Sequence, residues 1–315
     1  MQAVVITDGN LEIQERPTPE PGPYDVVVNV HAAGINAADL LQRQGFYPAP
    51  AGWPADIPGL EMAGVVGAVG DRVGEPLLGR RVCAIVGGGG QATHCLVPAE
   101  HLIFIPDDVS WAEAGGFAEA FTTAHDALVT QGHLETGQRV LISGANGGVG
   151  TAAVQIAHAL GAHVTAVTRT NEHHGQLRLL GADETITTGE VASIDRVNLV
   201  LELVGAANLS QAQNILAPRA RIVVIGVGGG SRVEIDLRFI MALRATLTGS
   251  TLRARSREEK ADVVARVNQS LVPRWTDREL RVTVARSFDL EDATKAYECF
   301  AESGKFGKVV LHVDQ

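Results

Sequence analysis

The chain has 315 residues, of which 45% are hydrophobic and 20% are charged. This composition is typical of a soluble globular protein, and the length predicts two domains rather than a single core. The formal net charge of −10 argues against a nucleic-acid-binding surface, which needs a basic stripe.

The sequence shows no targeting segment or membrane span. Residues 1–6 have the pattern of a strand, without the basic and apolar stretches of a signal peptide. No apolar run approaches the ~20 residues that cross a bilayer. The three cysteines, Cys83, Cys95 and Cys299, are far apart and odd in number, which favours free thiols over a disulfide framework. We therefore expect a cytoplasmic protein.

Residues 1–119 have the pattern of a compact, mainly β domain. Short runs of β-forming residues alternate with glycine and proline turns, and helical periodicity is scarce. The predicted strands include residues 26–31, 64–69, 81–86 and 94–98. The end of the chain has a strand–helix–strand pattern, and we expect residues 272–315 to pack back on this domain.

Residues 120–271 alternate between strands and helices. The predicted helices are residues 119–132, 150–160, 172–180, 210–216 and 256–271, and the predicted strands are residues 139–143, 163–167, 198–202, 221–225 and 245–250. Strands that are apolar on both faces and alternate with helices indicate a parallel sheet covered on both sides. The fold class is therefore α/β, with a doubly wound (Rossmann) nucleotide-binding domain and a mainly β domain.

The strongest local motif is VLISGANGGVG at residues 140–150, in which an apolar strand runs through a glycine-rich turn into a helix. Glycines let the backbone approach a pyrophosphate, and the free N–H groups of the helix N-terminus bind its charge. The G-x-x-G-x-x-G spacing alone also fits a plain turn, but the β/α units that follow favour a dinucleotide. The predicted contacts are Gly144, Asn146, Gly147, Gly148 and Val149.

The end of the next strand indicates which nicotinamide cofactor is bound. NAD sites usually carry an acidic residue there for the ribose 2′-hydroxyl, but this strand ends in Thr168, Arg169 and Thr170. A cation and two hydroxyls suit a 2′-phosphate, with His173 as a further donor. The alternative is a solvated arginine at a strand end. We therefore predict NADPH.

Further cofactor contacts are expected where later strands end, because ligands of doubly wound sheets lie at the carboxyl ends of the strands. Val204 and Gly205 follow one strand, and Gly226, Val227 and Gly228 follow the next. Two basic residues, Arg253 and Lys308, are expected to reach the cofactor as well.

Motifs along nearly the whole chain resemble those of the quinone oxidoreductase (zeta-crystallin-like) family of the medium-chain dehydrogenase/reductase superfamily. They are AAGINAADLLQRQGFY at 32–47, PGLEMAG at 58–64, GGGGQA at 87–92, the glycine loop, and GKFGKVVL at 304–311. Residues 42–45 and 88–92 are most similar to the tumour-suppressor-inducible branch. The resemblance implies that the mainly β domain is a GroES-like catalytic domain.

The resemblance also argues against zinc. Zinc alcohol dehydrogenases of this superfamily carry a Cys near residues 35–36 and Gly-His-Glu around residues 59–61, where this chain has Asn36 and Leu60. A catalytic zinc needs three well-placed ligands, and the adjacent His94 and Cys95 point to opposite faces of a strand. We therefore expect a metal-free enzyme.

By resemblance, the catalytic residues are Asn36, Asp39 and Tyr47, in an interdomain cleft near the nicotinamide. Tyr47 would donate a hydrogen bond to the acceptor oxygen, or it only packs a loop. Asp39 would orient Asn36 or the cofactor, or it only caps a helix. Glu61 matches a family glutamate, which we interpret as structural.

The predicted function is reduction of quinones by hydride transfer from NADPH. Many relatives carry Lys where this chain has His173 and Tyr where it has Thr188, so fewer groups remain here for the 2′-phosphate. The first alternative is an ene-reductase acting on α,β-unsaturated ketones or aldehydes, with Tyr47 as the proton donor. The second is a non-enzymatic NADPH-binding redox sensor.

By resemblance we also expect a homodimer. Residues 245–250 (ATLTGS) alternate in polarity and contain no Lys or Pro that would block pairing of a strand edge.

Overall fold

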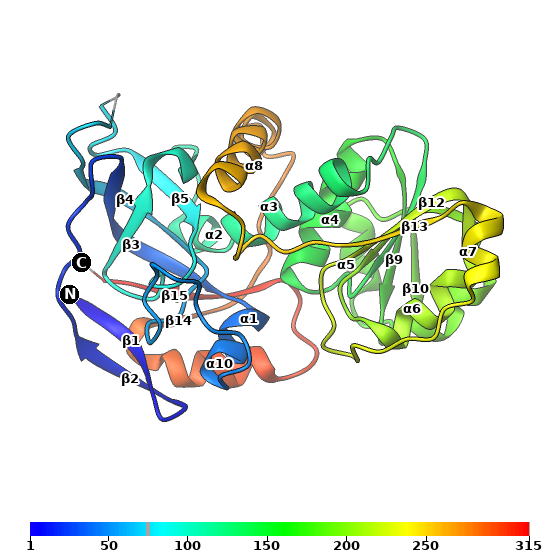
Figure 1. The fold of residues 1–315 in the computed structure, drawn as a ribbon, viewed down its shortest axis with the longest axis horizontal. Helices are drawn as coiled ribbons and strands as arrows, with labels where there is room; N and C mark the ends of the chain where they lie inside the picture. The colour runs from blue at the N-terminus through cyan, green and yellow to red at the C-terminus, as the bar shows by residue number, and fades with distance from the viewer. Residues whose placement is uncertain (74–75, 315) are drawn as a thin grey trace. The chain divides into compact units, whose positions relative to one another are not determined.

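The computed structural model describes residues 1–73 and 76–314, which form two compact units (Figure 1). Unit 1 consists of Met1–Thr122 and the chain from Leu252 onward, and unit 2 is the continuous stretch Thr123–Thr251. The cysteines are free, as predicted. Within the described residues, no helix has the length and apolar character to cross a membrane.

Unit 2 contains a doubly wound sheet of six strands. Its strands are β8 (Arg139–Ser143), β9 (His163–Thr168), β10 (Glu184–Thr187), β11 (Val197–Glu202), β12 (Leu216–Val224) and β13 (Thr246–Gly249). All neighbours pair in parallel, in the order β10-β9-β8-β11-β12-β13. The strand order reverses between β8 and β11, which is where such sheets bind dinucleotides. The predicted Rossmann fold is confirmed.

The helical segments of unit 2 precede or connect these strands. They are the π-helix η2 (Asp126–Gln131), α4 (Gly148–Ala159), α5 (His174–Leu179), η3 (Thr188–Ser193), α6 (Ala206–Ala212), η4 (Gln213–Ile215) and α7 (Leu237–Leu243). The helix predicted at 210–216 begins four residues earlier, directly after Gly205. Its predicted end lies in η4 and the first residue of β12, because Leu216 is drawn into the apolar core of the sheet.

Unit 1 is built around a seven-stranded sheet with the path β14-β15-β3-β4-β5-β7, and β6 also pairs with β3. These strands are β3 (Asp25–Ile35), β4 (Glu61–Val69), β5 (Arg81–Ile85), β6 (His94–Pro98), β7 (Ile103–Phe104), β14 (Val284–Asp289) and β15 (Lys308–His312), and a separate hairpin contains β1 (Gln2–Thr7) and β2 (Asn10–Glu15). The last strand, β15, pairs with β3 (Figure 1). The end of the chain therefore packs on the N-terminal domain, as predicted.

The helices of unit 1 surround this sheet. They are α1 (Ala37–Arg43), η1 (Ala99–His101), α2 (Trp111–Gly115), α8 (Arg257–Ser270), α9 (Val272–Thr276), η5 (Leu290–Asp292) and α10 (Ala293–Ala301), and α3 (Ala118–His125) crosses the unit boundary. Both α2 and α10 pack against β3, β14 and β15.

The second boundary between the units lies at residues 251–252, so α8 belongs to unit 1, whereas the sequence predicted a domain boundary at 271–272. Val263, Val264 and Val267 form the buried face of this helix. The Asn268 side chain accepts from Phe104 N at 3.3 Å and donates to the carbonyl of Leu102 at 2.9 Å. These contacts fix α8 against η1 and β7.

Candidate functional site

The predicted glycine loop lies between β8 and α4 in unit 2. Gly144 has φ +64°, and a side-chain carbon at Gly150 would collide with the Gly144 carbonyl. No side chain caps the first turn of α4, which begins at Gly148. An uncapped helix N-terminus after a tight glycine turn fits the pyrophosphate of a dinucleotide. The predicted contacts Gly144, Asn146, Gly147, Gly148 and Val149 are all half-buried.

A buried carboxylate, Glu202, anchors the loop after β11. Its Oε1 accepts from Ser143 Oγ at 2.6 Å and from the amides of Val204 and Gly205 at 2.7 Å each. Burial raises the pKa of Glu202, while these hydrogen bonds oppose the shift. The predicted residues Val204 and Gly205 therefore use their amides inside the protein and not toward a ligand.

The loop after β12 packs against the loop after β11. A side-chain carbon at Gly226 would collide with the Leu203 carbonyl, and Gly229 N donates to the Val204 carbonyl at 2.7 Å. Val227 is 52% exposed beside them. The structure thus brings the predicted residues Val204, Gly205, Gly226, Val227 and Gly228 together at the same edge of the sheet.

The residues predicted to bind the 2′-phosphate of the cofactor lie at the end of β9 and directly after it. Thr168 is buried, and its hydroxyl is hydrogen-bonded to the Thr170 carbonyl at 2.7 Å and lies 3.0 Å from His174 Nε2. Arg169 and Thr170 are exposed, and within the described part of the chain the Arg169 guanidinium has no hydrogen-bonding or ionic partner. His173 Nδ1 lies 2.6 Å from Gln176 Oε1. The Arg169 guanidinium is therefore available to an anion.

In unit 1, Asn36 belongs to a buried charged network with Glu61 and Lys308. Lys308 Nζ lies 2.6 Å from Glu61 Oε1, 2.5 Å from Asn36 Oδ1 and 3.2 Å from the Ile35 carbonyl. Asn36 Nδ2 donates to Glu61 Oε1 at 3.0 Å, and Glu119 N donates to Glu61 Oε2 at 2.8 Å.

This network bears on two predictions. An ammonium group has three protons, and the three acceptors around Lys308 use all of them. The predicted contact of Lys308 with the cofactor therefore does not fit this structure. Glu61 is fully buried, pairs with Lys308 and fixes the amide of Asn36. This arrangement agrees with the structural role that the sequence suggested for Glu61.

Asp39 lies in the first turn of α1 and is fully buried. Its carboxylate accepts from the amide of Asn36 at 2.8 Å and from the amide of Gly59 at 3.1 Å. Burial raises the pKa of Asp39 to about 7, against the opposing effect of both amides. Asp39 thus caps the helix, holds the backbone of Asn36 and connects α1 to the segment before β4.

Tyr47 follows α1 and is held by Arg253. Arg253 donates from Nη1 to the Tyr47 carbonyl at 2.8 Å, from Nε to the Gly87 carbonyl at 2.9 Å, and from Nη2 to Gln42 Oε1. Its guanidinium carbon lies 5.0 Å from the centroid of the Tyr47 ring. Arg253 is 4% exposed and belongs to unit 1. Three of its five N–H groups are therefore used inside unit 1, and a contact with the cofactor would have to use the remaining two.

Across residues 1–73 and 76–314, no three His, Cys, Asp or Glu side chains gather in a way that could hold a metal ion. His94 and Cys95 lie on β6, where His94 Nδ1 is 3.0 Å from Thr93 Oγ1 and the Cys95 thiol is buried.

The sequence matches two domain families, described as "Alcohol dehydrogenase GroES-like domain" over residues 22–168 and "Zinc-binding dehydrogenase" over residues 148–269. The quinone oxidoreductase of Lama guanicoe is 31% identical over 305 residues, which cover 93% of this chain and 90% of that protein. The chain belongs to the quinone oxidoreductase family. This family is part of the medium-chain dehydrogenase/reductase superfamily, so the resemblance and the GroES-like domain predicted from the sequence are confirmed.

Solved structures share the fold over the whole length of the chain. The quinone oxidoreductase of Thermus thermophilus, also determined as a complex with NADPH, is 33% identical, has a TM-score of 0.86, and matches 99% of this chain and all of that one. An NAD-dependent alcohol dehydrogenase is 27% identical, has a TM-score of 0.87, and is matched over the full length of both chains. The fold alone therefore does not decide the substrate or the cofactor.

Sequence reasoning missed two parts of the site in this family member. Glu202 ends β11 in an apolar run, and only the paired amides of the next turn reveal its role. The second part is the buried contacts of Lys308 and Arg253, because partners of both side chains lie more than 200 residues away in the sequence. A signal for Lys308 was available, because a lysine at the start of an otherwise apolar strand needs a buried partner.

We predict that Asp39 lowers the stability of the protein as the pH rises from 5 to 7. Its pKa is raised from 3.8 to about 7, so the folded protein keeps a proton that the unfolded chain releases in this range. The contribution of Asp39 to the free energy of unfolding is thus undiminished below pH 3.8 and is lost as the pH approaches 7. Urea unfolding should show the wild type losing roughly 1–3 kcal/mol relative to Asp39→Asn over this range.

The control for this prediction is Asp108→Asn, at an exposed turn position, which should follow the wild-type profile. Parallel profiles for the wild type and Asp39→Asn would mean that Asp39 is already ionised in the folded protein.

Proposed function

We propose that this protein reduces quinones with NADPH by transferring a hydride from the nicotinamide, without a metal ion. The match to quinone oxidoreductases over 93% of the chain carries the proposal. An acceptor that is already electrophilic needs no Lewis acid, so the protein's contribution is to bind, orient and exclude water.

The loops at the carboxyl ends of β8, β9, β11 and β12 would hold the dinucleotide. The amides at the start of α4 bind the pyrophosphate, and Arg169 binds the 2′-phosphate with Thr170 and His173 beside it. The Arg169 guanidinium is exposed and has no partner among the described residues, and β9 ends without an acidic side chain. Both features favour NADPH over NADH. Bound NADPH supplies the hydride.

Unit 1 would supply the groups that face the acceptor. Within the described residues the Tyr47 hydroxyl makes no hydrogen bond, so it is available to the acceptor oxygen as negative charge develops there. The amide of Asn36 is fixed on both sides by Glu61 and Lys308. Asp39 acts through Asn36 as a positioning residue. Asn36 and Leu60 replace the Cys and His of zinc enzymes, which supports a reaction without zinc.

The proposed function predicts that the purified protein, kept in EDTA, oxidises NADPH when given 1,2- or 1,4-quinones. The absorbance of the reduced nicotinamide reports turnover, and 2-cyclohexenone serves as the enone comparison. Faster turnover of the enone would favour the ene-reductase alternative. Tight NADPH binding without turnover on any acceptor would favour a redox sensor. Activity that EDTA abolishes would contradict the metal-free mechanism.

Arg169→Ala is expected to raise the KM for NADPH about 10–100-fold and to leave the KM for NADH nearly unchanged. A charge-assisted contact with the 2′-phosphate is worth roughly 1.5–3 kcal/mol, and NADH lacks that phosphate. Steady-state kinetics with both cofactors measures the difference. Arg196→Ala is the matched control, because Arg196 is exposed just before the amino end of β11. An equal effect of Arg169→Ala on both cofactors would remove the assignment.

We also propose that the protein is a homodimer that pairs through the edge of β13. β13 is the last strand of its sheet, and it carries Leu247, which is 46% exposed. Nearby parts of unit 2 expose further apolar side chains, with Leu237 at 73% and Met241 at 75% on α7. An unprotected strand edge with apolar neighbours favours pairing with a second copy.

Sedimentation velocity at micromolar concentration should therefore give twice the chain mass of 33.2 kDa. Leu247→Lys should shift the protein to monomer, because it places a charge on the paired edge. Leu179→Lys, at a position of α5 that is 88% exposed, should leave the dimer intact. A wild type that sediments only as monomer would contradict the proposal.

A further inference from the structure

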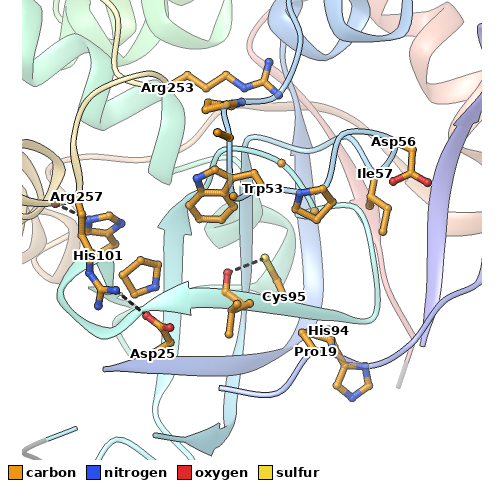
Figure 2. A pocket seen from close by; sticks show the side chains of 18 of the residues that line it. Pro19, Asp25, Trp53, Asp56, Ile57, His94, Cys95, His101, Arg253 and Arg257 are labelled. Atoms are coloured by element: carbon orange, nitrogen blue, oxygen red, sulfur yellow. Dashed lines mark hydrogen bonds and ion pairs between the residues drawn. The ribbon is translucent and has the colours of Figure 1, made fainter. Parts of the chain in front are cut away.

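Unit 1 contains a cavity of about 830 Å³ that is lined by none of Asn36, Asp39 and Tyr47 (Figure 2). Its volume lies in the range of small-molecule sites. The wall comes from the chain start, the segment around Trp53, β6, and the segment from Arg253 to the first turn of α8. Figure 2 shows the indole of Trp53 near the middle of this wall, between Arg253 on one side and His101 and Arg257 on another.

The wall carries more positive than negative charge. Its lysine and arginine side chains number five, against two aspartates, although the whole chain has a net charge of −10. The lining cations are Arg16, Arg253, Arg255, Arg257 and Lys260, and the aspartates are Asp25 and Asp56.

Both aspartates are already paired with arginines of the wall. Arg16 lies 2.9 Å from Asp56, and Arg257 lies 3.0 Å from Asp25. Arg253 donates only to neutral oxygens, so no carboxylate of the described residues pairs with its charge.

Lys260, like Arg253, has no anionic partner among the described residues. Only 7% of the residue is exposed, and within the described residues its ammonium makes no hydrogen bond or ion pair. Its charged contact is with the face of Trp53, 5.6 Å from the ring centroid. Burial and the nearby charge of Arg253 both lower the pKa of Lys260. A lysine this deeply buried normally has an anionic partner, so the cavity has the charge of a site that lacks its anion.

Apart from His94 and His101, the rest of the wall is mainly apolar. Trp53 offers a flat aromatic face, and Ile57 and several prolines surround it. A planar apolar body can stack on the indole while the ammonium beside the ring binds an attached negative group.

We propose that this cavity binds a small organic anion, a carboxylate carried on a flat aromatic body, with the carboxylate at Lys260 and the body against Trp53. This site is additional to the proposed quinone reduction and does not depend on that reaction. Arg253, which lines the cavity, also holds the Tyr47 segment, so the occupant lies next to a residue that positions the proposed acceptor site.

The test is isothermal titration calorimetry with 2-naphthoate on the full-length protein, with and without saturating NADPH. We expect saturable binding in both conditions. Lys260→Met should weaken it at least about 10-fold, because it keeps the apolar stem and removes the charge. Lys260→Arg should restore most of the affinity. Lys295→Met is the control, since Lys295 is 69% exposed on α10 and pairs with Asp292. The neutral 2-naphthamide should bind at least about 10-fold more weakly than 2-naphthoate.

Three outcomes would overturn the proposal. The first is the absence of saturable 2-naphthoate binding to the wild type, and the second is unchanged affinity in Lys260→Met. The third is loss of binding in the presence of NADPH, because 2-naphthoate would then be occupying the dinucleotide site. If Lys260→Met does not fold by circular dichroism, Trp53→Phe provides the second test. That variant must lose the quenching of tryptophan fluorescence by 2-naphthoate.

Discussion

The ion pair between Lys308 on β15 and the buried carboxylate of Glu61 on β4 holds unit 1 together. Glu61 has no exposed surface and Lys308 has almost none, so neither charge is stabilised by water. Removing either partner would leave an isolated buried charge, which costs about 3–5 kcal/mol. The pair also fixes the amide of Asn36, and the backbone of Asn36 begins α1 through its contact with Asp39. The position of the segment that carries Tyr47 therefore depends on this ion pair.

A second buried cation, Arg253, also holds the segment that carries Tyr47. Arg253 joins Gln42 at the end of α1, the carbonyl of Tyr47 and the glycine segment at Gly87. A guanidinium suits this task because its planar fork binds several acceptors in fixed directions, which a lysine cannot do. The proposed acceptor site of unit 1 is thus held by two long basic side chains that would not contact the substrate.

The sequence predicted the arrangement of unit 2 well because its signals are local. The strand β8, the glycine turn and the helix α4 follow one another directly, and periodicity and backbone freedom reveal all three. β10 was not predicted, because ETIT is short and half-buried along its whole length. The predicted domain boundary after α8 differs from the boundary between the two compact units, because nothing in the pattern of α8 tells which unit covers its apolar face.

The site was predictable only where the contacting residues lie close together in the sequence. The roles of Lys308 and Arg253 depend on partners 272 and 211 residues away, which the local sequence does not reveal. The cavity beside Trp53 was not predictable, since its wall combines segments from both ends of unit 1. Asn36 and Asp39 carried a local signal, because their spacing is that of a helix cap.

Unit 1 is formed by two separate stretches of the chain, and this affects the order in which the two units can fold during synthesis. Unit 2 is one uninterrupted stretch, whereas β15 inserts between β14 and β3. During translation, β3 emerges with an open hydrogen-bonding edge, and Glu61 emerges long before its counter-ion. Unit 2 can complete its own sheet while still attached to the ribosome, but unit 1 is completed only after β15 has been synthesised. The nascent chain therefore passes through a stage in which the nucleotide-binding half is formed and the other half is still open.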